Sequence, residues 1–182
     1  MRTFNWEMVV AVAGTALASG CTIDVGPGQI APFVLEEQVD LAEADGITAP
    51  DGMTSFSMAE NIEFLSADAA ADLDRRYGGK LNAVEAIDVR LDDLSVRRAD
   101  DGSEPPGMAL AIVLDGVPLT VGQRTRLPGD WIGRLREAVH AHEALTGPLR
   151  YTLTVRPDDA DAVLTARATV QPFMIVDVAK AL

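Results

Sequence analysis

The feature that most constrains the fold is a strict alternation of apolar and charged residues near the middle of the chain. From Ile87 to Leu91 the odd positions are apolar and the even positions are charged. Successive side chains of a strand point to opposite faces, so the pattern is typical of a strand with one buried face and one wet face. The alternation restarts out of phase at Leu94 because Asp92 and Asp93 are adjacent. This extra residue predicts a β-bulge.

The same analysis predicts about seven strands along the chain. They cover residues 33–41, 56–64, 84–96, 108–114, 117–121, 149–154 and a closing stretch, 162–178, that Pro172 breaks in two. The continuously apolar run 108–114 predicts a central strand covered on both faces. Asp115 and Gly116 predict a tight turn after it, and Pro118, which has no N–H, predicts that the return strand is an edge. Residues 44–52 and 122–129 are expected to be loops.

Two segments have the pattern of helices. Ser66 can cap a helix that runs to Tyr77, and the glycines that follow can end it in the left-handed conformation. Asp130 can cap a second helix that runs to about residue 145 and is closed by Gly147, with Trp131 on its apolar face. The expected fold is therefore mainly β, antiparallel and sandwich-like, with two α-helices near residues 66–77 and 130–145.

The N-terminal stretch has the pattern of an export signal. Arg2 supplies a positive start, and residues 8–18 form an apolar run that is too short to span a bilayer. Two small residues, Ser19 and Gly20, precede Cys21, which is the only cysteine of the chain. We expect export, with two alternatives to modification of the cysteine: an unmodified buried thiol, or an ordinary secretory signal cut elsewhere.

This arrangement resembles the lipobox of bacterial lipoproteins, although Ala18 stands where that family usually has Leu, Val or Ile. The resemblance implies that Cys21 is acylated, as with palmitate, and that a signal peptidase cuts after Ser19 and Gly20. It implies a signal peptide over residues 1–20, and the Gly- and Pro-containing stretch 21–32 is then expected to be a flexible tether. Residues 33–182 would form a single β-rich domain.

The charge balance restricts the partners. The formal net charge is −13, and residues 21–55 contain seven acidic residues and no Lys or Arg. Nucleic-acid binding needs a basic surface, so we expect no nucleic-acid partner. Electrostatic attraction to anionic lipid headgroups is also disfavoured. The acids could face a cationic partner or Ca²⁺, or could serve solubility alone.

No catalytic motif stands out. His140 and His142 would point about 200° apart on a helix and cannot share one metal ion. The nearest approach to a calcium loop is the aspartate cluster Asp158, Asp159 and Asp161, which turn chemistry explains equally well. There is no Gly-x-Ser-x-Gly elbow and no phosphate-binding loop. We expect no cofactor.

These observations favour a binding or assembly role rather than catalysis. The expected protein is a cell-envelope lipoprotein held by its lipid anchor, and Thr22 after the cysteine fits retention at the outer membrane. Its partner would be an envelope protein or a ligand. Two alternatives stay open: a secreted or anchored hydrolase that uses carboxylates, and a small carrier of lipid or another ligand between the sheets.

Overall fold

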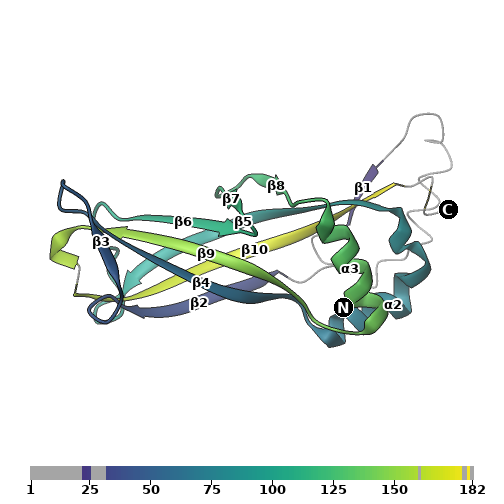
Figure 1. The fold of residues 1–182 in the computed structure, drawn as a ribbon, viewed down its shortest axis with the longest axis horizontal. Helices are drawn as coiled ribbons and strands as arrows, with labels where there is room; N and C mark the ends of the chain where they lie inside the picture. Colours follow the sequence, from purple (N-terminus) through teal and green to yellow (C-terminus); the bar gives the residue numbers. More distant parts are fainter. Residues whose placement is uncertain (1–21, 26–31, 160, 178–179, 181–182) are drawn as a thin grey trace.

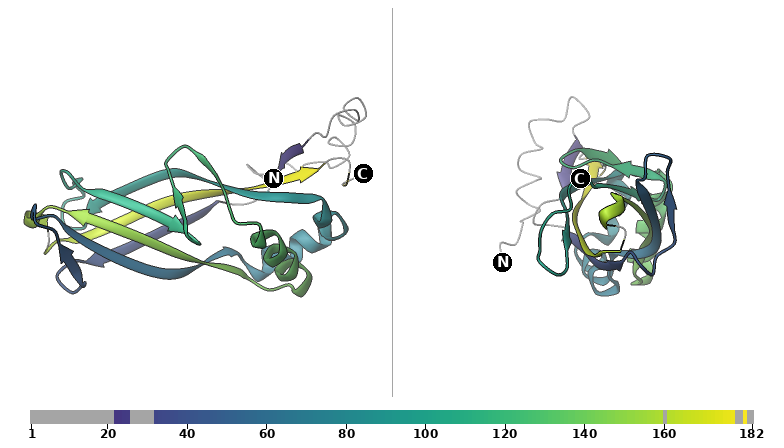
Figure 2. Two further views of the ribbon diagram at one scale, coloured as in Figure 1. Left: turned by 45° about the horizontal axis from the view of Figure 1, so that its top comes forward. Right: turned by 90° about the vertical axis from the view of Figure 1, so that its left-hand side faces the viewer.

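The computed structural model describes residues 22–25, 32–159, 161–177 and 180. The molecule is elongated, with two antiparallel sheets along its length and two helices at one end (Figure 1). Seen along the long axis, the strands surround a common interior (Figure 2). The prediction of a mainly antiparallel β fold with two α-helices is confirmed.

The first sheet is built around a long C-terminal strand. Its order is β1-β10-β5-β8, and β2 pairs with the same edge of β10 as β1 does. The strands are β1 (Thr22–Val25), β2 (Phe33–Asp40), β5 (Val84–Arg98), β8 (Arg124–Arg126) and β10 (Val163–Asp177). Because β1 and β2 come first in the chain and β10 comes last, this sheet joins the two ends of the described sequence.

The second sheet has the order β3-β4-β9-β6-β7. Its strands are β3 (Gly46–Thr48), β4 (Thr54–Leu65), β6 (Ala109–Leu114), β7 (Val117–Leu119) and β9 (Leu145–Val155). The short strands β3 and β8 lie in stretches expected to be loops, so those two predictions are wrong in part. Each is only three residues long, and a run of that length has no readable period.

The helices begin close to where the sequence predicts. In α2 (Ala67–Tyr77) the Ser66 hydroxyl accepts from the Ala69 N–H at 3.2 Å, as expected for a cap. Gly78 is right-handed, not left-handed, because the chain continues into the 3₁₀ helix η1 (Gly78–Ala83). A second 3₁₀ turn, η2 (Pro157–Asp159), lies where a turn was expected.

Helix α3 (Asp130–Ala141) is shorter than predicted. Gly129 occupies the cap position without a side-chain bond, and His142 ends the helix in the left-handed conformation, with φ 57°. Residues 145–147 belong to β9, where Leu145 pairs with Leu65 and Gly147 pairs with Ile62. Pairing with β4 therefore decides the structure of this segment.

The predicted bulge and tight turn are both present. Leu91 pairs with Val170 and Asp93 with Thr169, so Asp92 is the extra residue of β5. At the turn between β6 and β7, Asp115 and Gly116 have φ of 49° and 80°. Positive φ at both central residues is typical of the type I′ hairpin turn. β7 carries Pro118 and is an edge strand, as predicted.

Two strand predictions need correction. Pro172 does not break the closing strand, because β10 is continuous and Pro172 pairs with Val89 of β5. On the other edge of β10, β2 reaches Val170 and β1 begins at Met174, so Pro172 falls between them, where the ladder requires no N–H from it. β6 is not covered on both faces, since Ala109 and Ala111 are exposed.

One further strand lies within the stretch that was expected to be a flexible tether. Thr22 to Val25 form β1 and pair antiparallel with residues 174–177 of β10. The strand therefore starts directly after Cys21 and is part of the first sheet.

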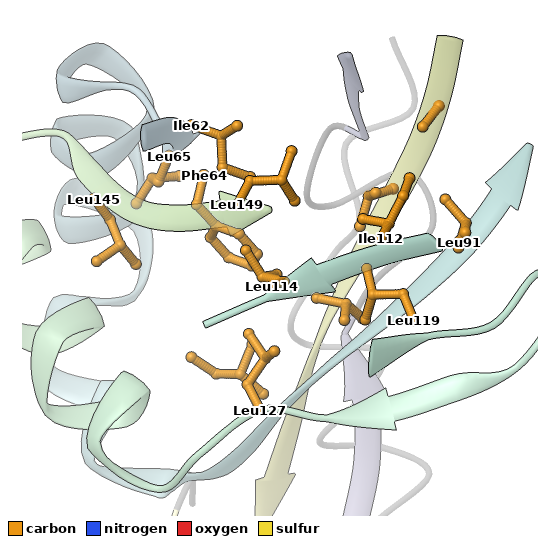
Figure 3. Close-up of a cluster of buried hydrophobic side chains, with 14 of the residues drawn as sticks. Ile62, Phe64, Leu65, Leu91, Ile112, Leu114, Leu119, Leu127, Leu145 and Leu149 are labelled. Atoms are coloured by element: carbon orange, nitrogen blue, oxygen red, sulfur yellow. The ribbon is translucent and has the colours of Figure 1, made fainter. Parts of the chain in front are cut away.

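The core lies between the two sheets and extends under the helices. Leucines and isoleucines from β4, β5, β6 and β9 converge in the interior (Figure 3). Trp131 of α3 is fully buried against Phe64, with ring centroids 5.0 Å apart in an edge-to-face arrangement. Its Nε1–H donates to the Asp115 carboxylate at 2.7 Å. The expectation that Trp131 lies on the buried face of a helix is confirmed.

Candidate binding cleft at an open seam

The two sheets meet along a seam that no described strand closes. Within the described part of the chain, β2 pairs only with β10, and residues 57–65 of β4 pair only with β9. Figure 1 draws the two strands along the same side of the molecule, and residues of both line one cleft. We call this region, residues 33–40 and 57–65, the open seam. Its unpaired backbone edges are the first unusual property of the site.

The inward-facing row of each edge strand contains one glutamate. On β2 that row includes Leu35 and Val39, with Glu37 between them. On β4 it runs through Met58 and Ile62, with Glu60 between them. Each glutamate thus occupies a position at which the alternation would place an apolar residue.

Both glutamates line one cleft that leads into the apolar interior. Its cavity volume is about 20 Å³, which is room for about one water molecule. The floor is buried and the two glutamates at the mouth are exposed. The lining residues are Leu35, Glu37, Glu60, Ile112, Leu149, Tyr151, Ala166, Arg167 and Ala168.

The surroundings of Glu37 disfavour the charged form of its carboxyl group. The pKa of the Glu37 carboxyl is raised, chiefly because burial desolvates its charged form and secondly because Glu60 is a like charge nearby. Arg167 is the one cation in the lining, and its guanidinium lies 3.9 Å from Glu36. The mouth is therefore negative and would be stabilised by a positive group from outside.

The floor of the cleft adds one polar atom. Tyr151 is 7% exposed, and its hydroxyl makes no hydrogen bond within the described residues. Buried polar groups normally have a partner, so this hydroxyl is available to a ligand or a water molecule. The cleft thus combines an apolar floor, one hydroxyl and two carboxylates, a combination that suits an apolar group joined to a cationic group.

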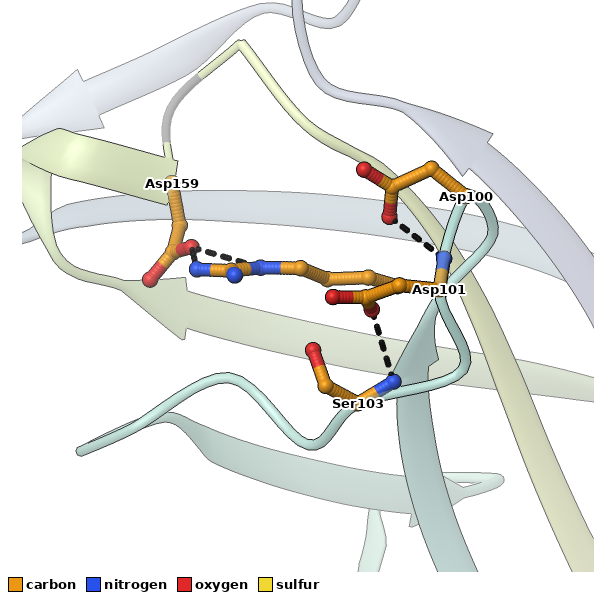
Figure 4. Close-up of polar contacts among 5 residues, drawn as sticks. Asp100, Asp101, Ser103 and Asp159 are labelled. Atoms are coloured by element: carbon orange, nitrogen blue, oxygen red, sulfur yellow. Dashed lines mark hydrogen bonds and ion pairs between the residues drawn. The ribbon is translucent and has the colours of Figure 1, made fainter.

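The expected lipidation residue and its neighbours, Cys21, Ser19 and Gly20, lie outside the described residues. The structure describes the aspartate cluster, and the three carboxylates do not point toward one site. Asp158 and Asp161 are exposed, whereas Asp159 is buried and its carboxylate binds the Arg98 guanidinium, with Nε at 3.1 Å (Figure 4). Among the described residues, no group of three His, Cys, Asp or Glu side chains is placed to hold a metal ion.

The two histidines do not form one site. His142 Nε2 lies 3.0 Å from the Asp74 carboxylate and links α3 to α2, whereas His140 is exposed beside the exposed Glu137. Figure 4 shows the turn after β5, close to the Arg98–Asp159 pair, in which Asp101 accepts from the Ser103 N–H at 2.8 Å and Asp100 accepts from the Asp101 N–H. The aspartates of that loop stabilise a turn.

Glu37 and Glu60 were not among the residues singled out in the sequence. A signal for both existed, because each is an acid at an inward position of an otherwise apolar alternation. The sequence alone does not show that β2 and β4 are neighbours. This arrangement of the strands brings the two acids to one cleft.

Searches of known protein families, curated proteins and solved structures found no match for this chain. Neither α2 nor α3, nor any other helix among the described residues, has the length and apolar character needed to cross a bilayer.

Proposed function

We propose that this protein is a cell-envelope lipoprotein whose β domain binds a partner at the open seam. The observation that carries the binding role is the cleft itself, with its apolar floor and two carboxylates at the mouth. The anchoring role rests on the N-terminal pattern that ends at Cys21. A cleft with room for about one water molecule can take the tip of a side chain but not a whole ligand.

The position of β1 supports anchoring at a defined end of the domain. β1 starts at Thr22 and pairs with the last residues of β10, next to the helices (Figure 1). An acylated Cys21 would be joined directly to this strand. The helical end would then face the membrane, and outer-membrane retention would follow from the residue after the cysteine.

One observation favours a second candidate, a hydrolase that uses carboxylates. A carboxyl group with a raised pKa beside a second carboxylate is the arrangement used by acid–base pairs. Loss of glycoside turnover in both Glu37→Gln and Glu60→Gln, with retention in Glu137→Gln on α3, would support this candidate. Equal turnover in all three variants, or none in the parent protein, would remove it.

The experiment that tests the anchor is the intact mass of the membrane-extracted protein beside a Cys21→Ala variant. We expect a chain that begins at Cys21 and carries acyl mass, and a variant that lacks this mass and leaves the membrane fraction. A parent chain without acyl mass, cut at another residue, would contradict the anchor and leave a soluble secreted domain.

A further inference from the structure

We infer that the open seam accepts an extended, positively charged peptide strand, which pairs with the free edges of β2 and β4 and places a Lys or Arg between Glu37 and Glu60. The inference rests on the proposed binding role of the cleft and names its partner.

The first argument is the backbone. Every second residue of an edge strand directs its N–H and C=O groups away from its partner strand. In the described residues these groups have no strand partner along β2 or along residues 57–65 of β4. A peptide that lies along either edge would satisfy them, which is the physical basis of recognition by strand addition.

The second argument is charge. The two edge strands contain five acidic residues and no Lys or Arg: Glu36, Glu37, Asp40, Glu60 and Glu63. Like charges oppose pairing of these edges with each other or with the same edges of a second copy. A basic strand would instead neutralise the two glutamates that face the cleft, and the like-charge repulsion between them would become attraction to a shared cation.

The third argument is the pattern of the rows that face inward. Each glutamate is flanked two residues away on both sides by apolar positions, Leu35 and Val39 on one strand and Met58 and Ile62 on the other. A strand between them would alternate in the same way. Its inward residues should therefore read apolar, basic, apolar at positions i, i+2 and i+4, with the basic residue above the floor of Ile112 and Leu149.

The test uses the full-length chain in detergent and a synthetic peptide, Thr-Val-Thr-Lys-Thr-Val-Thr, with blocked ends. Two control peptides accompany it. In one, Glu replaces the Lys; in the other, alternate backbone nitrogens are methylated, which keeps the charge but removes the donors that pair with an edge. Affinity is measured by calorimetry, and protection of backbone amides by hydrogen exchange.

We expect the Lys peptide to slow exchange both in residues 33–40 and in residues 57–65, and to bind at least tenfold more tightly than either control. The double variant Glu37→Gln/Glu60→Gln should reduce its affinity at least tenfold. The matched double variant Glu137→Gln/Glu143→Gln, which removes two exposed acids of the α3 region, should change it less than twofold.

Equal affinity for the methylated peptide would overturn strand addition, and so would a lack of protection at the seam. Equal affinity of the two double variants would overturn the role of the glutamates. Each of these results is independent of the mass of the chain at Cys21, so failure of the inference is distinguishable from failure of the proposed anchor.

Discussion

Glu37 destabilises the fold when it is ionised, because its pKa is raised by desolvation and by Glu60. Between the ordinary glutamate pKa and the raised one, the folded chain binds more protons than the unfolded chain, so stability falls as pH rises through that window. Above it the full cost persists. We expect Glu37→Gln to stabilise the protein at pH 7 by about 0.5 kcal/mol or less, since solvent screens the partly exposed carboxyl.

Urea unfolding at two pH values checks this prediction. The gain should disappear near pH 3.5, roughly where both folded and unfolded glutamates are protonated. Glu143→Gln, at an exposed position outside the seam, should be neutral at both. A variant at Glu37 that is less stable than the parent at pH 7 would show that the carboxylate has a stabilising partner.

Gly147 is required by the packing of Trp131. A Cβ atom at this position would lie 2.5 Å from Cη2 of the indole, and the buried ring is also tied to Asp115 by its N–H. We expect Gly147→Ala to lower the free energy of unfolding by about 2 kcal/mol, as overpacking of a core does. Chemical denaturation followed by circular dichroism measures the change.

Gly133→Ala is the matched control. Gly133 lies inside α3, and a Cβ there meets no heavy atom within 4 Å. The same substitution should stabilise the protein by up to about 1 kcal/mol, because alanine is the better helix former. Destabilisation by both variants would mean that the glycines matter for a reason other than the indole contact.

At the scale of elements, the bulge of β5 lets the apolar residues on both sides of it face the core. Asp92 is the unpaired residue, so its removal would leave Leu91 opposite Val170 and Asp93 opposite Thr169 in a regular ladder. We expect deletion of Asp92 to cost less than about 1.5 kcal/mol, mainly from the lost twist and the exposed ion pair with Arg90.

Deletion of Ser95, three residues further on, is the comparison. It would turn Val96, now 1% exposed, away from the core and reverse the faces of the rest of the strand. The cost should exceed about 3 kcal/mol. Denaturation curves of the two deletions test the assignment, and equal destabilisation would contradict it.

The elements that the sequence predicts correctly are those whose signal is local. The alternation of β5, the extra aspartate, the Asp115–Gly116 turn and the Ser66 cap each depend on a few adjacent residues. The errors concern partners. Pro172 is tolerated because it lies between the point where β1 ends and the point where β2 begins, which no local pattern contains.

The same holds for the site. Glu37 and Glu60 each break an apolar row, and that much is visible in the sequence. Their meeting depends on a seam between strands that share no ladder, so sequence patterns could identify the two acids but not the cleft.

At the scale of the whole molecule, the proposed anchor sets an orientation. β1 pairs with the helical end of β10, and the loop after Arg98 lies at the other end of the same ladder, about 45 Å away at 3.3 Å per residue. A fluorophore on Ala67→Cys at the start of α2 should therefore transfer energy to an acceptor in the bilayer more efficiently than one on Ala99→Cys. Both alanines are exposed.

The measurement requires the acylated protein in vesicles, where the Cys21 thiol is consumed and only the introduced cysteine reacts with the dye. Equal transfer from the two positions would mean that the domain lies flat or tumbles freely on its anchor.

The pairing of β2 with β10 has a consequence for how the chain reaches its destination. β2 has β10 as its only described strand partner, and β10 is the last of the described strands along the chain. β1 and β2 therefore cannot join the first sheet until residues 163–177 are available, and contacts between such distant segments form slowly. Under the proposed export, this order of pairing leaves β1 and β2 without their strand partner until synthesis has reached residue 163.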